Sequence, residues 1–394
     1  MVLTKKQEEG LKLAVERYHN RERYTVISGY AGSGKSTLVK FIISALQVDP
    51  NNVVYACFTG KAAQVLLKKG NPNVMTLHKL LYDSFPLPNG KFRRVPKISI
   101  APYEIVVVDE CSMAPKELVD LLLTHNCYII FLGDPFQLPP IDPKDDNHLL
   151  ECPHIFLDEI MRQAQENDII RLSMDIRMGK RLTNFDGKDA KIFSASQLSG
   201  GMLLWADQVL CATNKTRTAM NKQMRELNGR EGGPQDGDKF IFLRNYWDDF
   251  SYPEGSPLVN GTVGYIKNGY KSFVKYPYFI NGGGTFDTFV FNFISETGED
   301  YGEIKGDYKL ITEGEKSLDW QTEFAMQRNK IWKYRLPYEA TYGYAITTHK
   351  AQGSEWDKVL VLEENFPFAK EEHARWLYTA TTRAAEKLVL IRKD

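Results

Sequence analysis

The stretch Gly29-Tyr-Ala-Gly-Ser-Gly-Lys-Ser36 fills every fixed position of the phosphate-binding pattern G-x-x-x-x-G-K-[ST]. A β-branched apolar run precedes it at 24–28, and a helical pattern follows it at 37–46. This order is the context that the pattern requires, because the glycines let backbone N–H groups point at phosphate oxygens at a helix N-terminus. The sequence therefore predicts a nucleoside triphosphate site in an α/β fold.

Two side chains of this loop have expected roles of their own. The Lys35 ammonium is expected to reach the β- and γ-phosphates, and the Ser36 hydroxyl to ligate Mg²⁺. A glycine-rich turn without a nucleotide is the alternative, but chance produces such a match in roughly one or two chains per hundred of this length. The predicted nucleotide-binding residues of the loop are Gly29, Ala31, Gly32, Ser33, Gly34, Lys35, Ser36 and Thr37.

The composition limits the possible partners and compartments. Fifty basic residues balance fifty acidic ones, so any nucleic-acid site must be a local groove rather than a uniformly basic surface. No apolar stretch approaches the length of a membrane span, and the N-terminus lacks the apolar core of a signal peptide. We therefore expect a cytoplasmic protein without a membrane partner.

The cysteines have no C-x-x-C spacing, and at least three lie in apolar runs. Buried free thiols in a reducing compartment explain them better than disulfides or zinc. The five are Cys57, Cys111, Cys127, Cys152 and Cys211.

Short β-rich runs alternate with helical stretches along most of the chain. This alternation predicts parallel sheets covered on both faces. Only the first set of runs carries the phosphate loop, so we expect two α/β domains with a nucleotide between them. The predicted strands are 24–28, 53–58, 105–109, 128–132 and 154–157 in the first set, and 208–213, 358–362 and 387–391 in the second.

Two stretches interrupt this alternation. Residues 83–102 are proline-rich with an Asn89-Gly90 turn signal, which predicts a short hairpin insertion. Residues from about 240 to 338 are rich in Gly, Tyr and Phe, and turns such as Asn260-Gly261 separate their aromatic runs. This pattern predicts a small antiparallel barrel. The part at 315–334 is more helix-like.

The acid pair Asp109-Glu110 closes an apolar strand. The carboxyl end of such a strand is where open α/β sheets bind ligands. We expect Asp109 to hold the Mg²⁺ shell and Glu110 to orient and polarise the attacking water. A solvated strand end is the weaker alternative, because the phosphate loop and the acid pair occur together in this order.

The chain resembles the superfamily 1B helicases of the RecD and phage Dda branch. Singly, several of the motifs that carry this resemblance are weak, but ten in family order are very specific. They are Leu3-Thr-Lys-Lys-Gln7, GYAGSGKST (29–37), Phe58-Thr-Gly-Lys-Ala-Ala63, Thr76-Leu-His-Lys-Leu80, VVVDECSM (106–113), LGDPFQLPPI (132–141), Leu157-Asp-Glu-Ile-Met-Arg162, Cys211-Ala-Thr-Asn214, TTHKAQGSEW (347–356) and YTATTRA (378–384).

The resemblance implies two RecA-like motor domains in tandem with two insertions. The first motor domain is expected at 1–82 and 103–155, with a pin-like hairpin at 83–102. The second is expected at 156–240 and 339–394, with an SH3-like barrel and a helical segment at 241–338.

The resemblance also assigns nucleotide contacts outside the loop. It implies that Gln7 reads adenine, whereas a glutamine near an N-terminus is otherwise usually exposed. Gln137 is the implied γ-phosphate sensor, and Glu355 with Gly353 belongs to the implied nucleotide site, Glu355 at the ribose.

Arg162 and Arg383 are similar to the two arginines that approach the γ-phosphate. The usual alternative for either is a surface ion pair. A permanently charged, bidentate guanidinium suits the charge that spreads over the oxygens in phosphoryl transfer. Together with Lys35, Asp109, Glu110 and Gln137, they form the expected catalytic set.

The implied nucleic-acid path consists mainly of short hydroxyls and backbone amides, which grip phosphates without reading bases. A structural role is the equal alternative for the two histidines of this set. Few cations on the path imply a modest salt dependence. Phe92, beside the Asn89-Gly90 turn, is a candidate wedge against the first duplex pair, with packing as its alternative. The path residues are Thr59, Lys61, Thr76, His78, Thr213, Asn214, Thr348, His349 and Lys350.

The resemblance implies an ATP- and Mg²⁺-dependent, DNA-stimulated ATPase that moves on single-stranded DNA, separates forked duplexes and serves replication or repair. The implied direction is 5′-to-3′. An RNA-directed superfamily 1 helicase, a nucleotide-switched single-strand clamp and an unrelated phosphotransferase are the alternatives. We expect a monomer; the protein partners considered are a single-strand-binding, replication or recombination protein.

Overall fold

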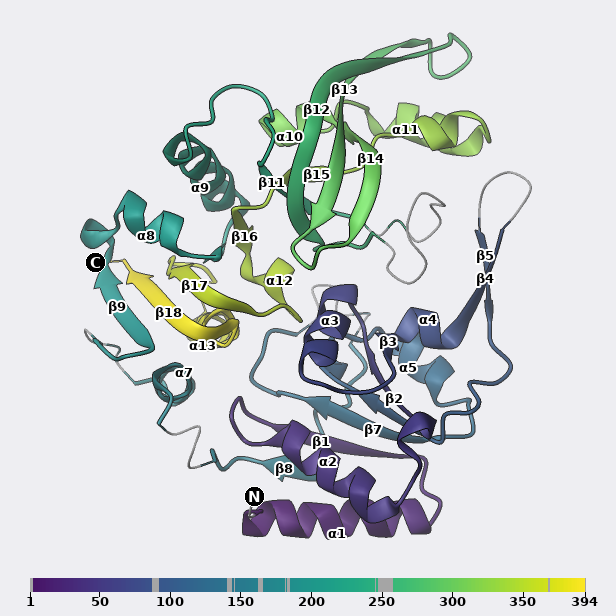
Figure 1. Ribbon diagram of the computed structural model, residues 1–394, viewed down its shortest axis with the longest axis vertical. Coiled ribbons are helices and arrows are strands. Elements are labelled where there is room, and N and C mark those ends of the chain that lie inside the picture. Colours follow the sequence, from purple (N-terminus) through teal and green to yellow (C-terminus); the bar gives the residue numbers. More distant parts are fainter. Residues whose placement is uncertain are drawn as a thin grey trace. The chain divides into compact units, whose positions relative to one another are not determined.

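The computed structural model describes residues 3–86, 92–139, 144, 146–161, 166–180, 182, 185–244, 246, 258–367 and 369–393. The chain divides into two compact units (Figure 1). Unit 1 comprises Met1–Ser84, Arg94–Thr213 and Thr347–Asp394, and unit 2 comprises Phe85–Arg93 and Asn214–Ile346.

Unit 1 contains a six-stranded parallel sheet that carries the phosphate loop. Its strand order is β3-β2-β6-β7-β1-β8. The strands are β1 (Tyr24–Gly29), β2 (Val53–Cys57), β3 (Val74–Thr76), β6 (Ile105–Val108), β7 (Tyr128–Gly133) and β8 (Ile155–Leu157).

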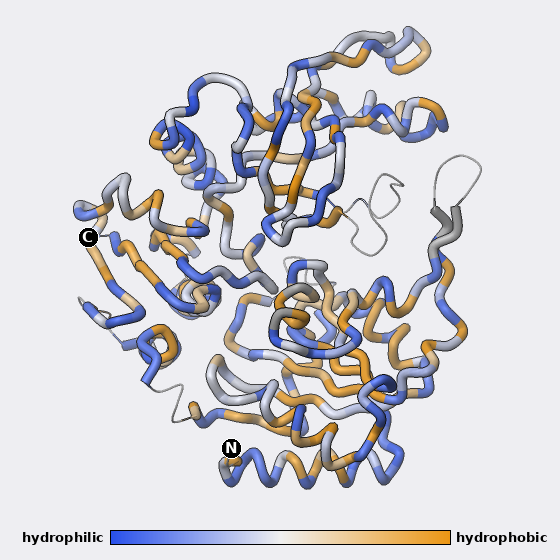
Figure 2. The backbone as a smooth tube through the Cα atoms, in the orientation of Figure 1, coloured by the Kyte–Doolittle hydropathy of each residue, from blue (hydrophilic) through white to orange (hydrophobic). Residues whose placement is uncertain are grey.

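Neighbouring residues of these strands enter two different cores, which is why the strands read as continuous apolar runs. Ile27 and Val107 pack on one face against α1 (Lys5–His19), α2 (Lys35–Leu46) and α3 (Gly60–Lys68). Val26 and Val108 pack on the other face against α4 (Leu77–Leu81) and α5 (Lys116–Leu122). The hydrophobic strands lie inside this layered arrangement in Figure 2.

A second sheet has the order β16-β10-β17-β18-β9, in which β10, β17, β18 and β9 of unit 1 pair in parallel. All three strands predicted for the second set are present here, and β9 is an addition. The two parallel sheets confirm the predicted pair of RecA-like α/β domains. The elements are β9 (Ala190–Ser194), β10 (Gln208–Cys211), β17 (Trp356–Leu362), β18 (Ala384–Arg392), α7 (Asp168–Arg177), α8 (Gly200–Trp205), α12 (Thr348–Ala351) and α13 (Lys370–Thr381).

Unit 2 contains a five-stranded sheet of order β14-β13-β12-β11-β15, whose neighbouring strands are antiparallel. An antiparallel insertion with a helical segment was predicted here; its assignment as an SH3-like barrel stays a prediction. The elements are α9 (Asn214–Leu227), β11 (Lys239–Phe242), β12 (Val263–Tyr276), β13 (Gly284–Ser295), β14 (Asp300–Asp307), α10 (Tyr308–Glu313), α11 (Trp320–Arg328), β15 (Ala340–Tyr342) and β16 (Ala345–Thr347).

The predicted hairpin insertion forms a two-stranded sheet of β4 (Tyr82–Pro86) and β5 (Phe92–Pro96). Its turn lies outside the described residues. The domain boundaries remain predictions; β8 pairs with β1 as far as Leu157. The short 3₁₀ helices are η1 (Pro50–Asn52), η2 (Cys111–Met113), η4 (Ala195–Gln197) and η5 (Trp332–Arg335).

All five cysteines are free thiols. Cys57, Cys111 and Cys211 are buried, Cys127 is partly buried and Cys152 is exposed. Among the described residues, none of the helices is both long enough and apolar enough to span a bilayer.

Candidate active site

The phosphate loop joins the end of β1 to the start of α2, as predicted. Two positions of the loop require glycine, each for a different structural reason. A Cβ on Gly29 would lie 2.6 Å from Ser33 Oγ and 2.8 Å from the Leu157 carbonyl oxygen, so a larger residue does not fit. Gly34 caps α2 with φ +81°, a conformation that glycine adopts without steric cost.

Polar groups of the loop are arranged to receive an anion. Lys35 Nζ donates hydrogen bonds to the Gly29 and Tyr30 carbonyl oxygens at 2.6 and 3.1 Å. Ser33 Oγ is buried and has no hydrogen-bond partner among the described residues. A buried hydroxyl without a partner is rare in proteins. The Lys35 ammonium and the unbonded Ser33 hydroxyl are groups that suit the phosphates of a nucleotide.

Gln7 is buried beneath this loop, although most glutamines near an N-terminus are exposed. Its Oε1 accepts a hydrogen bond from the Thr4 N–H at 3.0 Å, which closes the capping box of α1. Its Nε2 donates to the Ser33 carbonyl oxygen at 3.1 Å. Gln7 therefore ties α1 to the phosphate loop, and its adenine-reading role stays a prediction.

The acid pair lies directly after β6, where the chain leaves the sheet. Burial, followed by the neighbouring charge of Glu110, raises the pKa of Asp109 to about 6, and the Lys35 charge opposes this shift. Such a carboxylate lacks full charge compensation, which a divalent cation would supply. The carboxylate of Asp109 is therefore compatible in its chemistry with the predicted Mg²⁺ site, and the ligand role of the Ser36 hydroxyl stays a prediction.

Glu110 has an unusual backbone conformation. Its φ is +50°, in the left-handed region that few residues other than glycine adopt. Backbone strain of this kind is concentrated at functional sites, where the surrounding structure holds it in place. The conformation is therefore consistent with the predicted role of Glu110 at the reacting water.

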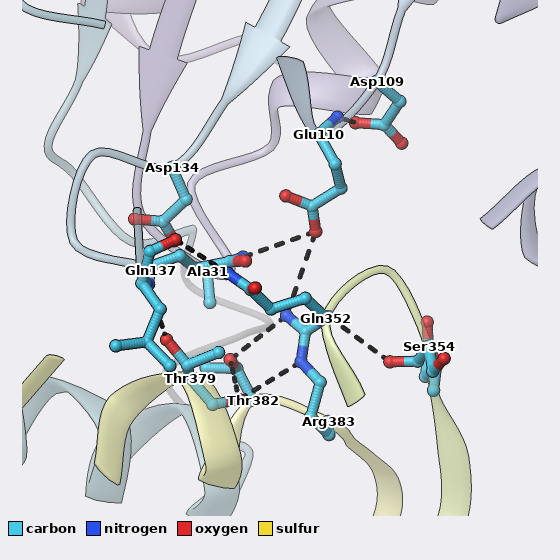
Figure 3. Close-up of polar contacts among 12 residues, drawn as sticks. Ala31, Asp109, Glu110, Asp134, Gln137, Gln352, Ser354, Thr379, Thr382 and Arg383 are labelled. Atoms are coloured by element: carbon cyan, nitrogen blue, oxygen red, sulfur yellow. Dashed lines mark hydrogen bonds and ion pairs between the residues drawn. The ribbon is translucent and has the colours of Figure 1, made fainter. Parts of the chain in front are cut away.

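Two side chains converge on the Glu110 carboxylate (Figure 3). Gln137 Nε2 donates to Glu110 Oε1 at 3.4 Å, and Arg383 Nη2 lies 3.8 Å from the same oxygen. The structure thus brings together three residues of the predicted catalytic set. Arg162, another residue of that set, lies outside the described residues.

Arg383 is only 6% exposed, so its guanidinium is fixed by the protein. Its Nε donates to the Thr379 carbonyl oxygen at 3.1 Å, and its Nη1 donates to the Ser354 carbonyl oxygen at 3.3 Å. Its Nη2 donates to Thr382 Oγ1 at 3.4 Å and also faces the Glu110 carboxylate (Figure 3). The arrangement excludes the alternative of an ordinary surface ion pair for this arginine.

Tyr378 is a site residue that sequence reasoning did not single out, although it lies in the YTATTRA motif. Its hydroxyl accepts a hydrogen bond from the Ala31 N–H at 2.8 Å and donates one to Asp134 Oδ2 at 2.6 Å. Asp134 is buried, and burial raises its pKa. One tyrosine of α13 therefore connects the phosphate loop with the loop that follows β7.

The backbone of Leu138 in that loop is also held at both polar atoms. Its N–H donates to Thr379 Oγ1 at 2.9 Å, and its carbonyl oxygen accepts from Gln352 Nε2 at 2.7 Å. Sequence analysis did not single out Thr379 or Gln352, although both lie in the motifs YTATTRA and TTHKAQGSEW that carry the resemblance. These bonds fix the loop that carries Gln137.

Glu355, the predicted ribose contact, forms an ion pair with Lys69 at 2.9 Å. Beside it, Lys61 Nζ lies 3.7 Å from the centre of the Trp356 ring. Gly353 has φ +69°, and a Cβ there would lie 3.2 Å from Thr59 Oγ1. The 347–356 motif thus lies against the start of α3, and the roles of Glu355 and Gly353 stay predictions.

Most threonines of the predicted nucleic-acid path already bond within the protein. Thr59 Oγ1 and Thr76 Oγ1 cap α3 and α4. Thr213 Oγ1 donates to Glu364 Oε1 at 3.0 Å, and Thr348 Oγ1 donates to the Cys211 carbonyl oxygen at 3.4 Å. The Thr213 and Thr348 hydroxyls therefore already use their donor hydrogens within the protein, whereas Thr59 and Thr76 only accept in their caps.

His78 lies between two aromatic rings. The centres of Phe58 and Tyr82 are 5.9 and 6.2 Å from the His78 ring centre. Burial, followed by the nearby charge of Arg94, lowers the pKa of His78 to about 4. Burial also lowers the pKa of His349. Neutral, packed imidazoles favour the structural alternative for both residues.

For three further predicted nucleic-acid contacts the structure gives the position in a helix or strand. Asn214 begins α9 and Lys350 lies in α12. The backbone of Phe92 begins β5, but its side chain lies outside the described residues, so its wedge role remains a prediction.

Two known protein families match separate parts of the chain. Residues 3–191 match the AAA domain family, and residues 342–391 match the UvrD-like helicase C-terminal domain family. These ranges contain the phosphate loop and acid pair in one case, and Arg383 in the other. The chain is thus similar to helicases of superfamily 1, and its relatives include the RecD2 and dda DNA helicases.

These relatives match at moderate identity. The ATP-dependent RecD2 DNA helicase of Deinococcus radiodurans is 27% identical, over 93% of this chain and 46% of its own length. The ATP-dependent DNA helicase dda of phage T4 is 28% identical, over 45% of this chain and 43% of its own. The chain thus spans less than half the length of these curated relatives.

The fold is similar to that of a solved Pif1 helicase. A crystal structure of Pif1 helicase from Bacteroides, in complex with ADP-AlF3 and single-stranded DNA, matches with a TM-score of 0.51 at 17% identity. The match covers 99% of this chain and 92% of that one. At this identity, the likeness concerns the fold alone.

Replacing Tyr378 by Phe removes the hydroxyl that joins Ala31 to Asp134 and keeps the ring. Because each of the two hydrogen bonds lost contributes about 1 kcal/mol, or about a factor of five, we expect ATP turnover to fall by about five- to thirtyfold with the KM for ATP nearly unchanged. Steady-state kinetics on Tyr378→Phe and on the control Tyr270→Phe, an exposed tyrosine, measure this. A rise in KM alone, or an equal loss in the control, would contradict the connecting role.

The neutral His78 predicts a pH-dependent stability. Since its pKa is about 4 in the folded chain and about 6.5 when unfolded, the unfolded state binds the extra proton between these values. The favourable contribution is therefore complete above pH 6.5 and is lost as the pH falls toward 4. Thermal unfolding between pH 7.5 and 5 should show a steeper fall for the wild type than for His78→Phe. Parallel curves would show that His78 titrates normally.

Proposed function

We propose that this chain is an ATP-dependent helicase that moves along single-stranded DNA and separates duplexes ahead of it. The observation that carries this proposal is that Arg383 and Gln137 meet at the Glu110 carboxylate, in the acid pair that directly follows β6. A site for nucleotide binding alone has no need of an arginine held against a candidate catalytic carboxylate. The names of the relatives, RecD2 and dda DNA helicases, agree with this activity.

The residues divide the chemistry among them. Lys35 and the amides of the phosphate loop bind the triphosphate, and Glu110 orients the attacking water and accepts its proton. Arg383 stabilises the charge that develops on the phosphoryl oxygens, for which a positioned arginine contributes about three to five orders of magnitude in rate. Mg²⁺, held by Ser36 and Asp109, would supply charge compensation for the phosphates.

Coupling to movement follows from where these residues lie. Glu110 and Gln137 follow strands of the first sheet, whereas Arg383 lies between α13 and β18 of the second. Release of the γ-phosphate removes the anion that both sets of residues bind, so hydrolysis alters the contacts between them. Such nucleotide-gated closure is a general way to alternate between tight and weak grips.

The finer features of the proposal rest on the family. We propose 5′-to-3′ movement on DNA and action as a monomer in the cytoplasm, with a single-strand-binding or replication protein as partner. RNA as the preferred track is the main alternative, because 2′-hydroxyl contacts leave no readable trace among these residues.

The carboxylate of Glu110 is the point at which a motor and a clamp differ. In Glu110→Gln we expect oligo-dT-stimulated ATP turnover to fall by about a hundredfold or more, since the general base is lost, while ATP binding persists. Turnover and nucleotide affinity should be measured with and without oligo-dT, with the exposed Glu117→Gln as control. Unchanged turnover in Glu110→Gln would favour the clamp. Wild-type turnover without stimulation by oligo-dT would remove the helicase proposal.

Forked duplexes with one single-stranded tail test strand separation and direction together. We expect ATP-dependent unwinding of the fork with a 5′ tail and little unwinding of the fork with a 3′ tail, because the motor must load on the strand along which it moves. Matching RNA tails separate the DNA and RNA alternatives. Equal unwinding from both tails would contradict the proposed direction.

A further inference from the structure

The outer half of the β12–β13 hairpin and α11 form a small subdomain within unit 2 (Figure 1). A hydrophobic cluster of its own holds these elements together. Asn281 Nδ2 at the hairpin end donates to Thr322 Oγ1 in α11 at 2.8 Å. The clustered residues are Val274, Ile280, Phe286, Leu318 and Met326.

Besides Phe273 and Tyr334, the same subdomain exposes four large aromatic side chains, two at the hairpin end and two in α11. Tyr278 and Phe279 at the hairpin end are 84% and 68% exposed. Trp320 and Phe324, one helical turn apart in α11, are 74% and 52% exposed. These four residues are called the aromatic platform below. Hydrophobic segments are visible at this hairpin end and in α11 in Figure 2.

The hairpin end holds its aromatics in a defined turn. The Ile280 N–H donates to the Pro277 carbonyl oxygen at 2.9 Å, and the Gly282 N–H donates to the Tyr278 carbonyl oxygen at 2.9 Å. Gly283 has φ +74°, and a Cβ there would lie 3.0 Å from the Tyr278 backbone. A fixed turn presents Tyr278 and Phe279 with a small loss of conformational entropy on binding.

The net charge of the subdomain distinguishes between a nucleic-acid ligand and an apolar protein partner. Residues 271–287 and 316–336 contain seven Lys or Arg and three Asp or Glu, which gives +4 in a chain of net charge zero. The Arg328 guanidinium carbon lies 5.7 Å from the Phe324 ring centre, and that of Arg335 lies 4.5 Å from the Trp332 ring centre. One arginine therefore lies against a ring of the platform, and a second lies against Trp332, which packs on the subdomain's core.

Exposed rings with a local positive charge match single-stranded nucleic acid. Each base offers a flat face to an aromatic ring, and its phosphate offers a negative charge to a nearby cation. An aliphatic protein partner has use for the apolar area but none for the surplus of cations. We propose that the aromatic platform is a second binding site for single-stranded nucleic acid, which stacks unpaired bases outside the strand path of the two parallel sheets.

This site rests on the proposed function, because it adds a contact to the same nucleic acid. It differs in its chemistry, since the path in unit 1 consists of amides, hydroxyls and lysines. Stacking on the platform would retain a strand while the motor changes its grip. Such retention extends each encounter with the track and does not require sequence preference.

The test uses the full chain with a Trp320→Ala/Phe324→Ala variant and a Tyr278→Ser/Phe279→Ser variant. We expect affinity for a long oligo-dT to fall by about five- to a hundredfold for each stack lost. Affinity for an oligo-dT just long enough for the motor path, and ATP turnover without DNA, should stay unchanged. The matched control is Tyr265→Ser, another exposed aromatic of β12.

Fluorescence gives an independent readout at one ring. A base stacked on Trp320 should quench its emission, so the wild-type quenching should exceed that of Trp320→Phe, whose affinity remains near the wild-type value. Unchanged affinity for long oligo-dT in both double variants, with DNA-stimulated turnover intact, would overturn the platform and leave the proposed function standing. An equal loss in Tyr265→Ser would also overturn it. Absence of any oligo-dT stimulation in the wild type would overturn both.

Discussion

The buried guanidinium of Arg383 is the constraint on which the arrangement of the candidate active site depends. A buried charge is costly unless it is paired and hydrogen-bonded. Here carbonyl oxygens of Thr379 and Ser354 accept from the guanidinium, and the Glu110 carboxylate faces it. The group is satisfied only while the turn after α13, the 347–356 motif and the end of β6 stay together. A change in the charge near Glu110 therefore alters the contacts of elements from both parallel sheets.

The loop after β7 makes this connection specific. Leu138 is bonded through both backbone groups, and Asp134 accepts from the Tyr378 hydroxyl, which also accepts from the phosphate loop. Gln137 lies between these anchors and reaches Glu110. Because its backbone is held on either side, Gln137 has little freedom to move independently of α13. A nucleotide sensor needs this property, since a freely rotating side chain transmits no displacement.

The sequence predicted the layers of the fold better than it predicted the side-chain contacts. Strands such as β1 and β6 are buried on both faces, so their apolar runs identify them without knowledge of their neighbours. β3 has only three residues and β9 includes Lys191 and Ser194, so the local pattern of neither is enough to identify a strand without its pairing partner. The length of the β12–β13 hairpin was also unpredicted, because its register depends on cross-strand pairs. Long-range pairing decides such elements, and local pattern does not record it.

The same limit applies within the site. Motif spacing predicted that Lys35, Asp109 and Glu110 lie near one another, because parallel strands bring their carboxyl ends to one edge. It did not predict the left-handed backbone of Glu110. Nor did it predict the double role of the Tyr378 hydroxyl, whose partners Ala31 and Asp134 lie hundreds of residues away in the chain. The hydroxyls have structural roles that the motifs do not record: Thr76 and Thr348 are buried, Thr76 Oγ1 caps α4 and Thr348 Oγ1 donates to the Cys211 carbonyl oxygen.

This use of the hydroxyls has a consequence for how a neutral chain can hold a polyanion. If buried threonines serve as caps and braces, phosphates on the path of unit 1 meet mainly amides and a few lysines, which release few counterions on binding. Binding of the phosphates on that path then depends on the positions of the backbone amides, and a small displacement of these amides releases the strand. Retention of the strand must come from another kind of contact, and stacking is suitable because it depends weakly on salt and on the position of the motor. Separating a releasable grip from a persistent one allows a motor to step without losing its track.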